Sequence, residues 1–144
     1  MPPATPVPVL REYPAIFLPG DPTAPRRART RAREGLTVIG WQGDVVAATE
    51  VVAALVENAV THAVMPDLLG EGVTVNLSIT QDGRLIIDVL DPKPAFPDFE
   101  RVRMASGCGL WHVQQLQAEV TWFTPPDCSG KTVRATMLPG PVAL

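Results

Sequence analysis

Three polar side chains stand at the end of a long apolar stretch in the first half of the chain. Asn58, Thr61 and His62 follow a segment in which valine, alanine and leucine occupy nearly every side of the predicted helix. Such a helix is buried between other layers. Buried polar groups need partners, and a bound ligand can be one. Asn58 and His62 lie one turn apart on one face, which makes them candidate ligand-binding residues.

Two further groups of candidate residues come later in the chain. Asp91 ends an apolar strand pattern and precedes Pro92, so its carboxylate could accept a hydrogen bond from a ligand or simply start a turn. Gly107 and Gly109 precede a short helical pattern. They could leave backbone N–H groups free at a helix start, where the helix dipole favours anions, or they could be an ordinary glycine-rich start.

Two glycine-containing segments resemble nucleotide-binding motifs, but the residues around them do not fit those motifs. Residues 130–132 (Gly-Lys-Thr) resemble the end of a P-loop, but that motif requires a glycine at the place of Pro125 and a helix afterwards. A strand pattern follows instead. The pair Gly107 and Gly109 does not continue to a dinucleotide fingerprint, because the third glycine position is His112. We also find no metal-binding box.

The hydrophobic patterns predict the elements that must position these residues. We expect strands at 13–18, 73–80, 85–90, 120–123 and 132–138, helices at about 22–39, 44–64 and 107–116, and a loop at 92–106. Asp82-Gly83 predicts a hairpin turn. This order indicates a two-layer α/β sandwich, with a mixed, mostly antiparallel sheet covered by helices on one face. We expect one domain at 11–139, a flexible proline-rich tail at 1–10 and a tail at 140–144.

Composition limits the classes of function. Lys and Arg number 12 and Asp and Glu 15, for a net charge of −3, which argues against general nucleic-acid binding. Arginines at 26, 27, 29, 31 and 33 are the local exception; they form either a solvated helix face or a contact surface for an acidic partner. No export signal or apolar run of about 18 residues is evident. We therefore expect a cytoplasmic protein, no membrane partner, and reduced Cys108 and Cys128.

Four segments, in their order along the chain, resemble one family. They are residues 50–63 with Asn58, residues 86–94 with Asp91, residues 106–113 with the two glycines, and residues 129–136 in the last strand. Together they resemble the histidine-kinase-like (GHKL) ATPases, and among these the stand-alone anti-sigma-factor serine kinases and related bacterial ATP-binding regulators. The resemblance covers residues 13–138. Each segment alone is a weak signal, whereas the ordered set indicates the fold.

The resemblance implies a site for ATP or ADP with Mg²⁺. It implies that Asn58 binds the metal, that His62 faces a phosphate and that Asp91 accepts from the adenine amino group. It places Gly107 and Gly109 at the phosphates, includes Leu110 among the nucleotide-binding residues and puts Thr132 near the adenine. An amide oxygen is a hard, neutral ligand suited to Mg²⁺. Structural alternatives stay open: Asn58 bonded to backbone, His62 as an interior histidine, and Thr132 as an ordinary strand residue.

The chain departs from the family one turn before Asn58. Family members usually carry a glutamate there that orients or deprotonates the attacking group, and this chain has Ala54. General-base assistance is typically worth about 10²–10⁴-fold. Glu57 should point about 100° away from Asn58 around the helix. Glu50, roughly 6 Å along the axis from Ala54 and about 40° around it, is the better substitute but has a long reach.

A second departure follows Asp91, where Lys93 and Ala95 replace the family's usual glycines. Three hypotheses follow from these departures. The first is a nucleotide-dependent regulator that binds a protein partner with weak or absent kinase activity. The second is an active serine-protein kinase acting on an anti-sigma-factor antagonist, since positioning can dominate phosphoryl transfer. The third is a nucleotide-free scaffold. The resemblance implies an anti-sigma-factor antagonist or a sigma factor as partner, and is compatible with a homodimer.

Overall fold

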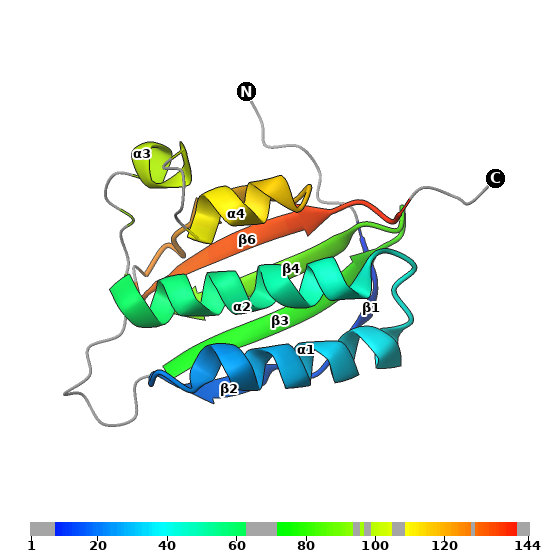
Figure 1. Ribbon diagram of the computed structural model, residues 1–144, viewed down its shortest axis with the longest axis horizontal. Helices are drawn as coiled ribbons and strands as arrows, with labels where there is room; N and C mark the ends of the chain where they lie inside the picture. Colours follow the sequence, from blue (N-terminus) through cyan, green and yellow to red (C-terminus); the bar gives the residue numbers. More distant parts are fainter. Residues whose placement is uncertain are drawn as a thin grey trace.

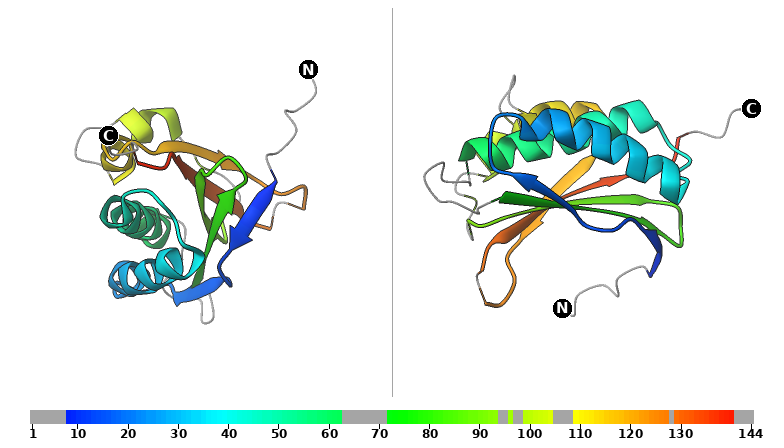
Figure 2. Two further views of the ribbon diagram at one scale, coloured as in Figure 1. Left: turned by 90° about the vertical axis from the view of Figure 1, so that its right-hand side faces the viewer. Right: turned by 90° about the horizontal axis from the view of Figure 1, so that it is seen from below.

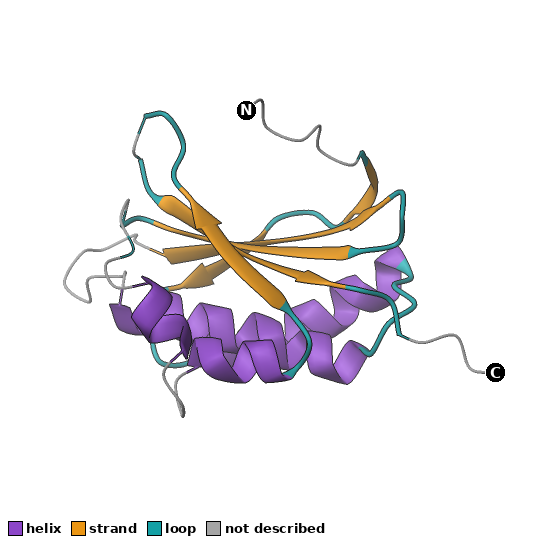
Figure 3. Cartoon of the chain, turned by 90° about the horizontal axis from the view of Figure 1, so that it is seen from above, coloured by secondary structure: helices purple, strands orange, loops and turns teal. Residues whose placement is uncertain are grey.

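The computed structural model describes residues 8–62, 72–93, 96, 99–104, 109–127 and 129–140. A six-stranded sheet carries the helices on one face and leaves the other face open (Figures 1, 2 and 3). Its strands are β1 (Val9–Glu12), β2 (Ile16–Pro19), β3 (Gly72–Thr80), β4 (Leu85–Asp91), β5 (Glu119–Phe123) and β6 (Lys131–Met137). The helices are α1 (Ala24–Ile39), α2 (Val45–His62), α3 (Phe99–Met104) and α4 (Gly109–Gln115). The expected two-layer sandwich is confirmed.

The sheet is built from antiparallel pairs. The strand order is β1-β3-β4-β6-β5, and β2 pairs with the other end of β3 beside β1. Every pairing among the described strands is antiparallel. The predicted hairpin joins β3 to β4, and Gly83 adopts a positive φ of 86° there, a conformation that glycine tolerates without strain. Along β4, Leu85, Ile87 and Val89 are buried under the helices while the residues between them are half-exposed.

Helix α1 is amphipathic because alanines recur on one of its faces. Ala24, Ala28, Ala32 and Leu36 are fully buried, and the arginines between them face outwards. The helix ends at Gly40, whose left-handed conformation, φ 70° and ψ 39°, closes the last turn. Small alanine side chains allow α1 to pack closely against α2 and the sheet.

Helix α2 is the central buried helix. It has 18 residues and a mean hydropathy of 1.3, which is long and apolar enough to cross a membrane by length and composition alone. In the structure, however, it packs against α1, α4 and the sheet, and 56% of it is buried. Its composition is therefore that of a core helix, as the all-round apolar pattern predicts.

Two expectations about the elements are wrong. The tail expected at 1–10 contains the start of β1, because residues 9–12 lack proline and can pair with β3. The loop expected at 92–106 contains α3, which begins after the last of the prolines. Its first residue, Phe99, packs edge-on against Phe96 at 4.9 Å between ring centroids. Cys108 and Cys128 lie outside the described residues.

Candidate functional site

A cavity of about 380 Å³ opens between α2 and α4. Its walls come from one face of α2 and from the start of α4, which runs alongside α2 in Figure 1. The lining residues are Ala54, Glu57, Asn58, Thr61, His62, Gly109 and His112. The structure thus brings Asn58, His62 and Gly109 together with Ala54, as residues of one cavity.

Asn58 is the innermost polar residue of this cavity. It is only 9% exposed. Ala54 and His62, one turn before and one turn after it on α2, line the same cavity. Its side-chain amide makes no hydrogen bond to another described residue, so the alternative in which Asn58 is tied to nearby backbone does not hold there. An amide held in a cavity without a protein partner fits the donor set of a metal or phosphate site.

Two lining residues were not expected from the sequence. His112 follows Gly109 by one turn of α4 and faces the same cavity, a relation that helical spacing from Gly109 could have revealed. Glu57 also lines the cavity, although its angular offset from Asn58 argued against it. Glu57 reaches the cavity despite its angle because it is exposed at the rim, where a flexible side chain can turn toward the opening.

Glu50, the other candidate base, pairs with helix α1 in this structure. Its carboxylate accepts two hydrogen bonds from Arg29 of α1, from Nε at 3.0 Å and Nη2 at 3.3 Å. The side-chain hydrogen bond to Glu50 raises the pKa of Arg29. Glu50 does not line the cavity. Glu50, the expected better replacement for the missing glutamate, is therefore paired with α1 and lies outside the cavity in this structure.

Ala54 lies where the two helices meet. A Cβ added to Gly109 would stand 3.7 Å from the backbone oxygen of Ala54, an ordinary van der Waals contact. Helix α4 therefore begins directly beside the position one turn before Asn58. Ala54 places only a methyl group in the cavity, and no carboxylate occupies this position.

Asp91 lies at the end of β4, directly opposite the first residue of β6. The register pairs Asp91 with Lys131, and their side chains form an ion pair that is 0% and 4% exposed respectively. Lys131 Nζ donates to Asp91 Oδ1 at 3.0 Å and reaches the backbone oxygen of Lys93 at 3.4 Å. The backbone N–H of Lys93 donates to the same Oδ1 at 2.9 Å, so Asp91 also starts a turn, as one alternative foresaw.

The second oxygen of Asp91 has an unusual environment. Oδ2 lies 2.9 Å from Lys131 Nζ but out of line for a hydrogen bond, and it has no other donor among the described residues. Burial raises the pKa of Asp91, and the hydrogen bond and charge of Lys131 oppose that rise. An orphaned buried acceptor suits a ligand donor such as an amino group. A ligand could reach it only if Lys131 or the neighbouring Phe96, whose ring centroid is 5.2 Å from Nζ, moved aside.

Thr132 is not beside Asp91 on the helix-covered face. Its strand partners are Leu90 and Phe123, and successive side chains of a strand point to opposite faces. Lys131, Val133 and the alternate residues after them face the helices, which leaves Thr132 on the open face. Lys131, and not Thr132, therefore shares a sheet face with Asp91.

The remaining expected residues divide between the core and the undescribed part of the chain. The side chain of Leu110 is fully buried in the core, so only its backbone could meet a ligand. Gly107 lies outside the described residues. Among the residues that the structure describes, no group of three or more His, Cys, Asp or Glu could hold a metal ion by itself. A metal at Asn58 would therefore need ligand oxygens from a bound molecule such as a polyphosphate.

Comparisons with known proteins identify the fold. The sequence matches no protein-family model and no curated protein. The structure is similar to the crystal structure of the RsbU and RsbW domains of Rv1364c from Mycobacterium tuberculosis, with a TM-score of 0.61 and 22% identity over 93% of this chain. It is also similar to the histidine kinase domain of the blue-light-activated histidine kinase EL346 from Erythrobacter litoralis, with a TM-score of 0.53 and 18% identity over 81% of this chain.

These similarities cover only part of the compared proteins. The chain spans 35% of the first chain and 60% of the second, so their complete activities and partners are not transferred by the match. The expectation drawn from the four sequence segments is confirmed at the level of the fold. The chain has the fold of the histidine-kinase-like, or GHKL, ATPases.

Proposed function

We propose that the protein binds ATP or ADP with Mg²⁺ in the cavity between α2 and α4, and that nucleotide binding controls its association with a protein partner. One observation carries the proposal: the Asn58 amide makes no hydrogen bond to another described residue and lies in a cavity that His62, Gly109 and His112 also line. A divalent ion that keeps several waters and phosphate oxygens needs few protein ligands, and one amide oxygen suits it.

In the proposed site, the adenine of the nucleotide lies at Asp91. Asp91 does not line the cavity beside Asn58. However, β4, which ends at Asp91, and α2 finish on the same side of the molecule (Figure 1). Oδ2 of Asp91, which has an ion-pair contact with Lys131 but no hydrogen bond in the described part of the chain, is the acceptor offered to an adenine amino group. Because Lys131 closes this acceptor, nucleotide binding includes a displacement of the Lys131 side chain, which lowers affinity by the free energy of that displacement.

The same site supports binding better than phosphoryl transfer. No carboxylate stands at position 54, and Glu50 is held by Arg29. Bound Mg²⁺ would supply charge neutralisation for the phosphates, while Asn58 orients the ion and His62 and His112 offer N–H groups to phosphate oxygens. We therefore propose a regulator with weak or absent kinase activity. An active serine-protein kinase acting on an anti-sigma-factor antagonist is the second candidate, because Glu57 at the rim could serve as a base.

The similarity to the RsbW domain supports a partner of the anti-sigma-factor regulatory type, an antagonist or a sigma factor. A nucleotide-free scaffold is the remaining alternative, and it makes the opposite prediction for ligand binding. A homodimer and a cytoplasmic location complete the proposal and rest on the resemblance and on the composition.

Isothermal titration calorimetry with MgATP tests the proposal. Wild-type protein should bind saturably, and Asn58→Ala should weaken binding about tenfold or more while the fold is retained, since a metal ligand is lost and little packing with it. Asn76→Ala is the matched control, because Asn76 lies on the open face of β3 across from Asp88. Absence of saturable binding by the wild type would establish the scaffold alternative instead.

A further inference from the structure

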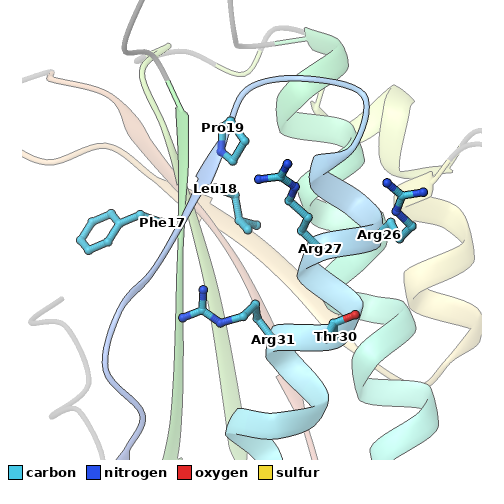
Figure 4. A pocket seen from close by; sticks show the side chains of 7 residues that line it. All are labelled: Phe17, Leu18, Pro19, Arg26, Arg27, Thr30 and Arg31. Carbon is cyan, nitrogen blue, oxygen red and sulfur yellow. The ribbon is translucent and has the colours of Figure 1, made fainter.

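A second cavity, of about 340 Å³, lies at the edge of the sheet between β2 and α1. We call it the arginine groove; it is lined by Phe17, Leu18, Pro19, Arg26, Arg27, Thr30 and Arg31. None of these residues lines the cavity around Asn58. Figure 4 shows the side chains of Arg27 and Arg31 directed from α1 toward β2, with Leu18 facing them, while Arg26 stands at the other side of the helix.

The arginines of this groove form no ion pair with another described residue. No ion pair in the described part of the chain involves Arg26, Arg27 or Arg31, whereas Arg29 on the opposite side of α1 is paired with Glu50. The charge of Arg27 acts on the carboxylate of Asp21, but hydrogen bonds from Thr23 lower the pKa of Asp21 more than Arg27 does. In a chain of net charge −3, this is a concentrated positive surface. It attracts an acidic ligand.

The strand beside the arginines has a free edge. β2 pairs with β3 on one side, and no described strand pairs with its other side. Backbone N–H and C=O groups on such an edge can pair with an added strand. Phe17 is 75% exposed, and its ring points to the side of β2 away from α1 (Figure 4). An added strand would therefore meet arginines on one face and an aromatic ring on the other.

The spacing of these groups fits an extended peptide. Arg27 and Arg31 are four residues apart on α1, or about 6 Å along the helix axis. Side chains two residues apart in an extended strand lie on one face and are separated by about 6.6 Å. An i, i+2 pair of carboxylates thus matches the two guanidiniums. The residues between them would point to the face of Phe17, where apolar side chains are favoured.

We propose that the arginine groove binds an extended segment of a protein partner in which acidic and apolar residues alternate, and that this segment adds to β2. The inference deepens the proposed function by locating its protein partner, and rests on that function for the partner being a protein. It does not require an occupied nucleotide site, because the two cavities share no residue.

Fluorescence anisotropy at near-physiological salt tests the groove, with a short labelled peptide of alternating Glu and Leu as the probe. A control peptide has the same composition with the Glu residues in one block and the Leu residues in another. The alternating peptide should bind saturably and about tenfold more tightly than the block peptide, because only alternation presents carboxylates to one face. Arg31→Glu should weaken its binding about tenfold or more, since a repelling charge replaces an attracting one.

Arg33→Glu is the matched control. It makes the same change of charge on the same helix at an exposed residue outside the groove, and it should weaken binding less than threefold. Phe17→Ser should weaken the alternating peptide but leave the block peptide unchanged. Nuclear magnetic resonance shifts on peptide addition should centre on β2 and the start of α1. Each variant is checked for an unchanged melting temperature before it is compared.

Four results would overturn the proposal: no saturable binding, equal binding of both peptides, equal losses for Arg31→Glu and Arg33→Glu, or displacement of the alternating peptide by inorganic tripolyphosphate at comparable concentration. The last would show a simple anion site. Calorimetry of Arg31→Glu with MgATP separates this failure from failure of the proposed function. Unchanged nucleotide binding with no peptide binding rejects the groove alone, and peptide binding without nucleotide binding rejects the nucleotide site alone.

Discussion

Lys131→Met should be strongly destabilising, because it leaves the buried carboxylate of Asp91 without its cation. The ammonium lies 3.0 Å from Oδ1 and 2.9 Å from Oδ2, and both side chains are almost completely excluded from water. Removing one partner of such a buried pair costs about 3–5 kcal/mol. That is a large share of the roughly 5–15 kcal/mol by which a domain is stable. Methionine keeps the unbranched stem of lysine, so the loss measures the charge rather than the packing.

Arg134→Met is the matched control. Arg134 belongs to the same strand and pairs with Asp88 of β4 at 2.7 Å, but its side chain is 38% exposed on the open face. The loss there should be about 1 kcal/mol or less, because water screens the pair. Urea unfolding of the wild type and the two variants gives both values. A Lys131→Met loss no larger than that of Arg134→Met would refute the buried pair.

The pH dependence gives a second readout of the same prediction. Burial raises the pKa of Asp91, and Lys131 opposes the rise, so removing Lys131 should raise the pKa further. A carboxyl with a raised folded-state pKa favours the folded state at low pH, and that stability is lost as pH rises through the folded pKa. The deficit of Lys131→Met should therefore shrink as pH falls from about 7 toward 5. A deficit that does not change with pH would contradict the assignment.

Three more outcomes follow from the site and the core. Ala54→Glu should raise phosphoryl transfer to a serine partner, measured with radiolabelled ATP, because it places a carboxylate one turn from Asn58; unchanged transfer in a folded variant would count against a missing base. Asp91→Asn should weaken binding of ATP more than of GTP by calorimetry, since it alters the acceptor for an amino group, and equal losses would contradict a base-reading role. Leu36→Ala should lower the free energy of unfolding by about 2–5 kcal/mol in urea titrations, because Leu36 is fully buried.

The periodic parts of the sequence were sufficient to predict most of the fold. The alanine stripe of α1, the all-round apolar α2 and the alternating residues of β3 each have a period that belongs to one kind of element. β1 and α3 escaped prediction, because both are short and follow prolines, and their stability comes from β3 and from Phe96 rather than from their own pattern.

The site was predicted less completely, because its details depend on contacts between distant elements. Asn58, His62 and Gly109 were found from their spacing, and the cavity does bring them together. The Arg29–Glu50 pair joins two helices and has no sequence signature, so the sequence could not show that Glu50 is paired. The strand register sets Lys131, and not Thr132, opposite Asp91, and the sequence alone could not show this because a side chain changes face with every single-residue step.

The location of a bound metal–nucleotide complex tests the central claim most directly. In nuclear magnetic resonance spectra recorded with ATP and Mn²⁺ in place of Mg²⁺, the paramagnetic ion broadens amide signals near it. The account predicts that the signals of Asn58, His62 and Gly109 are lost first, while that of Thr30 in the arginine groove is retained. Uniform broadening, or loss centred away from the cavity between α2 and α4, would contradict the account.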